Sequence, residues 1–131
     1  MPAPTRTLAA LLTAAALLAA GCGGDDEKDV RETLDAFAEA TAKKDYQRMC
    51  DDLLAPALIE QVRRVNLPCE VALRTGLEDV ERPRIEVRSV KIDGDNASAQ
   101  VRSTAANQEP SEDVVRLVKV DDEWRIASLA S

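Results

Sequence analysis

The sequence predicts an α+β domain in which helices pack on one face of a curved, antiparallel sheet of four strands. Two observations support this prediction. Up to about residue 80 the apolar residues recur every three or four positions, the period of a helix, and after Pro83 they alternate, the period of a strand. Short turn-forming segments separate the expected strands, and short connections favour antiparallel neighbours.

The first half of the domain is expected to be helical. Val30, Leu34 and Phe37 fall on one face of the first helix, with acidic residues at its start and two lysines at its end, as the helix dipole favours. Asp45 is a suitable N-cap for a second, short helix that ends before Pro56. The expected helices cover about residues 28–44, 45–55, 58–65 and 69–80.

The second half is expected to form the sheet. The alternation changes phase between Val87 and Val90, which predicts a β-bulge near Arg88 and Ser89. Asp93-Gly94-Asp95-Asn96 is typical of a hairpin turn, and a loop is expected over residues 107–111, where Pro110 stands. The expected strands cover about residues 85–92, 97–103, 114–120 and 124–129.

The start of the chain has the layout of a signal peptide. A short polar segment with Arg6 precedes an unbroken apolar run from Leu8 to Ala20. This run of about 13 residues is shorter than the roughly 20 that a membrane-spanning helix needs. The sequence therefore predicts export.

The apolar run is followed by Leu18-Ala19-Ala20-Gly21-Cys22, which resembles the lipobox of bacterial lipoproteins, with Ala19 where Leu is usual. The resemblance implies cleavage before Cys22 and a diacylglyceryl group on its sulfur, so that lipid holds the protein on the extracytoplasmic side of the cell membrane. Residues 1–21 are then the signal peptide, 22–28 the lipidated cysteine and a tether, and 29–131 the domain. The alternative is a secreted protein that keeps Cys22 as a free thiol.

The cysteine count agrees with lipidation. The chain has three cysteines, and acylation of Cys22 leaves Cys50 and Cys69 as an even pair in an oxidising compartment. A disulfide between them closes about 20 residues and is worth roughly 3 kcal/mol. A redox or metal pair is the alternative, but the spacing matches neither a redox motif nor a zinc site, and the chain has no histidine.

Charge and composition exclude several classes of function. The chain carries 17 basic and 24 acidic residues, a formal net charge of −7, and its cations are scattered among acids, which argues against nucleic-acid binding. No nucleophile elbow, phosphate-binding loop, dinucleotide fingerprint or metal-ligand spacing is present in the sequence. The sequence therefore predicts no catalytic residue, metal or cofactor.

Two segments resemble the nuclear transport factor 2-like superfamily. They are Lys43-Lys44-Asp45-Tyr46, between the first two helices, and the closing segment from Val120 to Leu129, which contains Trp124-Arg125-Ile126. The resemblance covers residues 30–131 and implies a cone in which helices and a bent sheet enclose a pocket. Members usually have Gly in the last turn, where this chain has Asp122. They include isomerases, cyclases, dehydratases and exported domains.

We therefore expect a membrane-anchored domain without catalytic activity that binds a small apolar ligand or a cell-envelope partner. The small side chain of Ala99 is expected to leave space beneath its strand, and Trp124 is a second candidate for the pocket. The alternative is an isomerase or cyclase that uses a carboxylate, Asp51 or Asp52, near Tyr46. A third interpretation is a homodimer that associates through the open sheet face.

Overall fold

The computed structural model describes residues 23–129. The predicted signal peptide and Cys22 lie outside these residues. The helical elements are α1 (Gly23–Lys43), α2 (Tyr46–Arg48), the π-helical turn η1 (Met49–Leu53), α3 (Pro56–Arg63) and α4 (Cys69–Leu77). The strands are β1 (Arg84–Asp93), β2 (Asn96–Ala105), β3 (Gln108–Val120) and β4 (Glu123–Leu129). Within residues 23–129, no helix is both long and apolar enough to cross a membrane.

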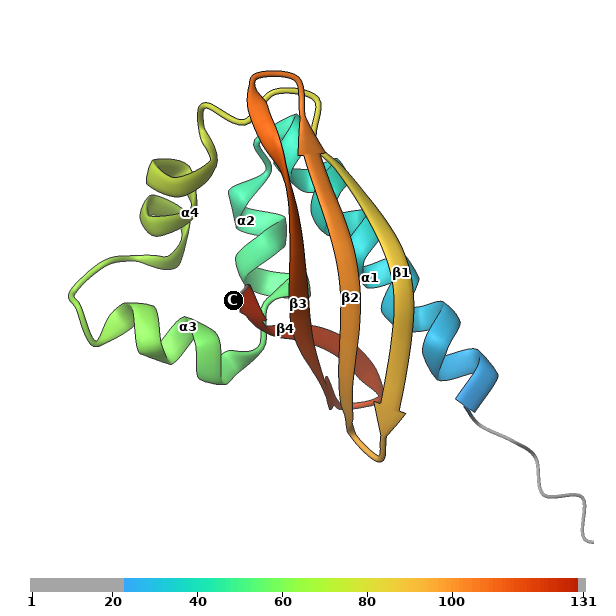
Figure 1. Cartoon of the computed structure of the whole chain (residues 1–131). Coiled ribbons are helices and arrows are strands. Elements are labelled where there is room, and N and C mark those ends of the chain that lie inside the picture. The colour runs from blue at the N-terminus through green and yellow to red at the C-terminus, as the bar shows by residue number, and fades with distance from the viewer. Residues whose placement is uncertain (1–22, 130–131) are drawn as a thin grey trace, which may run out of the picture.

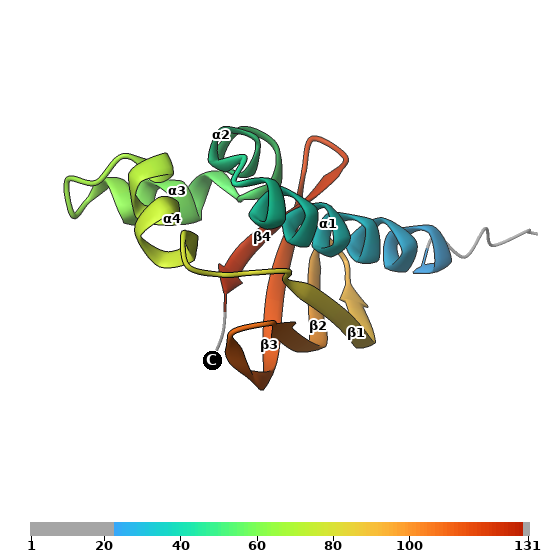
Figure 2. The ribbon, with the colours of Figure 1, turned by 90° about the horizontal axis from the view of Figure 1, so that it is seen from above.

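The four strands form one antiparallel sheet in the order β1-β2-β3-β4. Helix α1 runs across one face of this curved sheet, and α3 and α4 extend from the same side of the molecule as α2 (Figures 1 and 2). The expected α+β class, with helices packed on a four-stranded curved sheet, is confirmed.

The core lies between α1 and the facing side of the sheet. Val30 and Leu34 of α1 have no exposed surface, and neither does Ile126 of β4. Burying a side chain of this size contributes about 1.5–3 kcal/mol relative to leaving it exposed. The sheet contributes small and branched side chains that pack against α1: Ala97, Ala99, Val101, Val115 and Leu117.

The bulge and the first hairpin lie where the sequence predicts them. The register of β1 against β2 shifts between Val87 and Ser89, which returns Val90 and Ile92 to the core face. Gly94 has a φ of +59° at the first central position of the β1–β2 turn, the position at which a type II′ turn requires glycine.

The loop predicted for residues 107–111 is wrong. Strand β3 begins at Gln108, and Ala105 pairs directly with Gln108 across a tight turn. Pro110 lies at the irregularity that separates this pair from the pair of Ser103 with Ser111, and β4 pairs with β3 only from Val115 onward. The missing N–H of proline is tolerated at a bulge on a locally unpaired edge.

Residues 23–28 of the tether predicted for residues 22–28 are helical instead, because α1 begins at Gly23. The carboxylate of Asp26 accepts hydrogen bonds from Lys119 Nζ at 2.8 Å and from Trp124 Nε1 at 3.1 Å. These contacts with β3 and β4 hold the first turn of α1 on the domain. Its acidic residues also suit the positive end of the helix dipole.

The junction between α1 and α2 is formed by two capping motifs. Lys44 adopts a φ of +56°, and its N–H and that of Asp45 bond back to Thr41 O and Ala40 O, the pattern of a Schellman cap. Asp45 then caps α2, since its Oδ1 accepts a hydrogen bond from Arg48 N at 3.1 Å. The predicted N-cap is confirmed.

Candidate ligand-binding cavity

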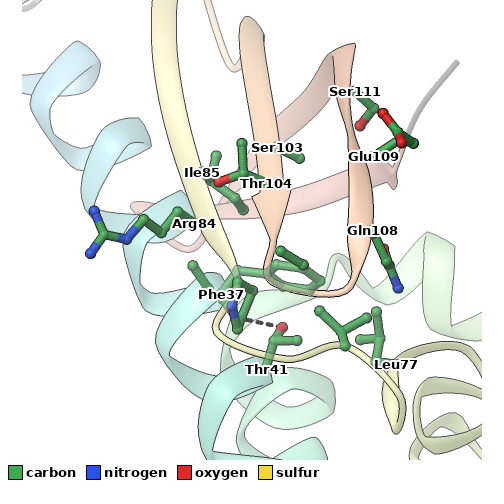
Figure 3. Close-up of a pocket in the computed structure, with 14 residues that line it drawn as sticks. Phe37, Thr41, Leu77, Arg84, Ile85, Ser103, Thr104, Gln108, Glu109 and Ser111 are labelled. Carbon is green, nitrogen blue, oxygen red and sulfur yellow. Dashed lines mark hydrogen bonds between the residues drawn. The ribbon is translucent and has the colours of Figure 1, made fainter.

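A cavity of about 170 Å³ lies at one end of the cone, between the second half of α1, the end of α4 and the β2–β3 hairpin (Figure 3). Its volume is near that of the apolar cavities that admit benzene, at roughly 150 Å³, and below the lower limit of roughly 300 Å³ for drug-sized ligands. Its lining is Phe37, Ala38, Thr41, Leu77, Val80, Pro83, Arg84, Ile85, Ser103, Thr104, Ala105, Gln108, Glu109 and Ser111.

The walls of the cavity are mostly apolar. Phe37 comes from the core face of α1 and is 7% exposed. Leu77 is the last residue of α4, Val80 follows in the connection to β1, and Ile85 lies at the start of β1. The half-buried side chains of Leu77 and Ile85 pack against the core, and that of Val80 lies at its edge. The cavity therefore lies between the apolar core and the solvent.

The polar groups lie at the floor and on one rim. Thr41 is the one buried polar residue in the part of the chain that the structure describes, and its Oγ1 donates to Phe37 O at 2.8 Å. Ser103 faces Ser111 across the β2–β3 ladder, and Gln108 and Glu109 are exposed beside them. A few polar groups around an apolar wall are typical of sites that orient a small ligand.

Helix α4 forms one wall of the cavity, and a few polar contacts and one covalent bond attach it to the rest of the domain. No residue of α3 or α4 is buried. At the far end of α4, Asn107 Nδ2 donates to Asp79 O at 2.6 Å and Ala106 N donates to Glu81 O at 2.8 Å, which ties the α4–β1 connection to the β2–β3 turn. Lys44 Nζ donates to Glu78 O from the end of α1.

The disulfide predicted between Cys50 and Cys69 is present in the structure. It joins η1 to the first residue of α4. Beside it, the guanidinium of Arg74 lies 5.9 Å from the centre of the Tyr46 ring. The covalent bond and this cation–π contact hold the start of α4 against the α2–η1 segment.

The four residues predicted to line the pocket lie elsewhere. Tyr46 is buried beneath Arg74, and its hydroxyl has no hydrogen-bond partner within the described residues. Asp51 is exposed on η1, where its carbonyl oxygen accepts a hydrogen bond from Arg125 Nη1. Ala99 is fully buried in the core, and Trp124 is buried beside Asp26. The structure does not bring these four side chains together.

There is a physical reason why these residues do not form the predicted pocket. The space expected under Ala99 is filled, because Ala97, Ala99 and Leu34 belong to one packed cluster. The carboxylate expected beside Tyr46 is absent, because Asp51 and Asp52 both lie on the exposed side of η1. None of the carboxylates within residues 23–129 is buried.

Two of the residues that line the cavity could have been noticed in the sequence, because they interrupt the apolar alternation of their strands. Ser103 and Ser111 stand on the core face of β2 and β3, at positions where the alternation predicts apolar side chains. Polar residues at core-facing positions indicate the end of the sheet at which the apolar core meets the cavity. Leu77 and Val80 could not be recognised, because their contact with the sheet depends on the path of the α4–β1 connection.

A second polar cluster lies at the other end of α1. Hydrogen bonds from Lys119 and from Trp124 lower the pKa of Asp26 below its ordinary value of 3.8, and the same bond to Asp26 raises the pKa of Lys119 above 10.5. The side chains of Asp26 and Lys119 are 14% and 26% exposed. Within the described residues no group of three or more potential ligands is arranged to hold a metal ion.

The fold is of the nuclear transport factor 2-like class. A crystal structure of such a protein of unknown function from Shewanella baltica OS155 matches with a TM-score of 0.59 and 16% identity, over 81% of this chain and 91% of that one. A de novo designed protein of the same fold, NT-9, matches with a TM-score of 0.48 and 15% identity, over 82% of this chain and 85% of that one.

Residues 25–130 match the model of the family described as "Putative lumazine-binding", and the chain belongs to this family. No curated protein matches the sequence.

Proposed function

We propose that this protein is an extracytoplasmic lipoprotein, anchored through Cys22, whose domain binds a small, largely apolar ligand without transforming it. The observation that supports binding most directly is the cavity between Phe37, Leu77 and Ile85, with its polar rim at one side. The family description names a ligand, lumazine, which is a flat bicyclic heteroaromatic compound.

The size of the cavity restricts the ligand. At about 170 Å³ the cavity accepts one small ring, or one part of a larger planar molecule. A fused heterocycle would insert its apolar edge beside Phe37 and leave its polar edge toward the rim that Gln108 and Ser111 line. Lumazine and benzene are therefore informative probes of this site.

The absence of catalysis is part of the proposal. Isomerases of this general type need a positioned acid or base inside an apolar site. The carboxylate that lines the cavity, Glu109, is exposed, and Tyr46 lies outside the lining. This arrangement favours holding a ligand over transferring a proton.

Binding is tested by titrating the purified protein with lumazine, followed by its fluorescence, and with benzene, followed by NMR shifts. We expect wild-type protein to bind at least one of them and Ser103→Phe to lose that binding at least tenfold, because its ring occupies the cavity. Ser98→Phe is the matched control, since Ser98 pairs with Lys91 and Arg116 on the opposite face of β2.

Two results would overturn the binding proposal. One is that wild-type protein binds neither probe, and the other is that both serine variants lose affinity equally. Circular dichroism of both variants ensures that the comparison is made between folded proteins.

The anchor is tested separately by metabolic labelling with a fatty-acid analogue in a bacterial host. We expect the wild-type chain to carry the label and to sediment with membranes, because two or more acyl chains hold a protein firmly. Cys22→Ser should carry no label. An unlabelled wild-type protein would refute the anchor while leaving the binding proposal intact.

A further inference from the structure

We infer that the cavity opens at the end of the domain that points away from the membrane, so that its ligand is a water-soluble molecule and not a lipid taken from the bilayer. This inference rests on the proposed anchor at Cys22.

Helix α1 places the point of attachment. It begins at Gly23, one peptide bond after Cys22. Its first turn is bound to the β3–β4 hairpin through Asp26, which accepts hydrogen bonds from Lys119 Nζ and Trp124 Nε1. Lys119 N in turn donates to Asp95 O at 2.8 Å, which joins the β1–β2 turn to the same assembly. We call this end of the domain, residues 23–29, 93–96 and 119–124, the anchor end.

The cavity lies at the opposite end. In an antiparallel meander the β2–β3 turn is at the other end of the sheet from the β1–β2 and β3–β4 turns. The cavity is lined by residues next to that turn, such as Ser103 and Gln108, and by Thr41 near the end of α1. Figure 1 shows the β2–β3 turn at the top and the start of α1 at the lower right. From Gly23 to Thr41 the helix rises about 27 Å, at 1.5 Å per residue.

The anchor end is strongly acidic. Its cations are Lys28 and Lys119, and its acids outnumber them. Acidic side chains are repelled by an anionic leaflet within a Debye length of about 8 Å. The anchor end is therefore held at the bilayer by the lipid on Cys22 and not by its own charge. The acids are Asp25, Asp26, Glu27, Asp29, Asp93, Asp95, Asp121, Asp122 and Glu123.

The orientation is measurable with one thiol-reactive fluorophore on the lipidated full chain in vesicles containing anionic lipid. Asp95→Cys places the label at the anchor end, and Ala106→Cys places it beside the cavity mouth, both at exposed positions. Cys50 and Cys69 are in their disulfide and do not compete for the label. A spin-labelled lipid quenches fluorophores near the bilayer, and iodide quenches those in water.

We expect the spin-labelled lipid to quench the label at residue 95 at least threefold more than the label at residue 106, and iodide to show the reverse order. Lumazine or benzene, whichever binds, should have the same Kd within twofold for protein in vesicles and in detergent. Equal or stronger lipid quenching at residue 106, or a tenfold loss of affinity in vesicles, would overturn the orientation.

Flotation of the vesicles distinguishes a failure of the proposed anchor from a failure of the proposed orientation. Protein that fails to float with vesicles would refute the anchor at Cys22, and with it this inference. Protein that floats but is quenched by lipid at residue 106 would refute the orientation alone.

Discussion

Asp26 ties the first turn of α1 to the sheet. Its hydrogen bonds to Lys119 and then to Trp124 lower its pKa, so the folded state favours the ionised carboxylate. A carboxyl with a lowered pKa stabilises the fold above its unfolded pKa of about 3.9, and this contribution is lost as the pH falls through the lower folded value. The raised pKa of Lys119 has the opposite sign, since its contribution is lost as the pH rises above about 10.4.

Asp26→Asn should therefore lower the midpoint of urea unfolding at pH 7 and reduce the loss of stability between pH 5 and pH 3. The neutral amide still accepts a hydrogen bond but no longer attracts the ammonium group of Lys119. Urea unfolding at a series of pH values measures both effects. Asp25→Asn is the control, because Asp25 is exposed in the same turn of α1. Identical pH profiles for the two variants would contradict the assignment.

The last hairpin turn carries a local backbone cost. Asp121 and Asp122 have φ values of +51° and +64°, the pattern of a type I′ turn, in which both central residues are left-handed. Asparagine, aspartate and glycine tolerate this region, and glycine does so without a steric penalty. The sequence left the type of this turn open because Asp122 stands where the superfamily usually has glycine.

Asp122→Gly should stabilise the protein by about 1 kcal/mol, because glycine adopts the left-handed conformation without the steric cost that an L side chain has there. Chemical denaturation measures the change. Asp95→Gly is the matched control in the other exposed hairpin, where the positive φ belongs to Gly94, so no gain is expected. A destabilised Asp122→Gly variant would show that the aspartate side chain contributes more than its backbone costs.

At the scale of elements, α4 forms a wall of the cavity although none of its residues is buried. Its attachment depends on the disulfide at its start and on the contacts of Asn107 and Ala106 at its end. A helix with so little buried surface has low local stability once such a constraint is removed. The disulfide therefore matters for the cavity as well as for the whole fold.

The double variant Cys50→Ala, Cys69→Ala should lose about 3 kcal/mol of unfolding free energy, the value for a closed loop of about 20 residues. We also expect its affinity for the small-molecule probe to fall, because Leu77 and Val80 are carried by the loosened wall. Urea unfolding and the lumazine or benzene titration measure these effects. Dithiothreitol should reproduce them in wild-type protein and change nothing in the double variant.

At the scale of the whole molecule, the cavity is at the end of the cone and not under the middle of the sheet. Ala99→Leu tests this location, because a larger side chain in a filled core costs about 1–3 kcal/mol. Thermal or urea unfolding measures the loss. If the variant is as stable as wild type, an unoccupied space must exist beneath β2, as the sequence alone suggested. The Ser98→Phe variant serves again as the control on the opposite face.

Much of the fold could be predicted from local patterns. The helical spacing of Val30, Leu34 and Phe37, the capping role of Asp45 and the phase change after Val87 all led to elements that the structure contains. These signals are reliable because each depends on residues within one or two turns of chain. The two largest boundary errors were at the start of α1 and the start of β3, because contacts distant in sequence extend both elements.

The candidate site was less predictable than the fold. Tyr46 and Asp51 were chosen for their chemistry, but burial under Arg74 and exposure on η1 depend on how α2, η1 and α4 are packed. The cavity residues are ordinary aliphatic and small polar side chains, and their chemistry does not distinguish them from the rest of the core. Only their positions around a space make them a site.

By itself the sequence determined the class of fold, the order of its elements and the pairing of Cys50 with Cys69, because periodicity, turn residues and cysteine count are local or countable properties. The tertiary structure alone decided that α1 starts at Gly23 and that the cavity lies at the far end from it. The physical reason is that a boundary or a cavity depends on segments distant in the chain. Asp26 is bonded to Lys119, and Leu77 and Ser103 line the same cavity.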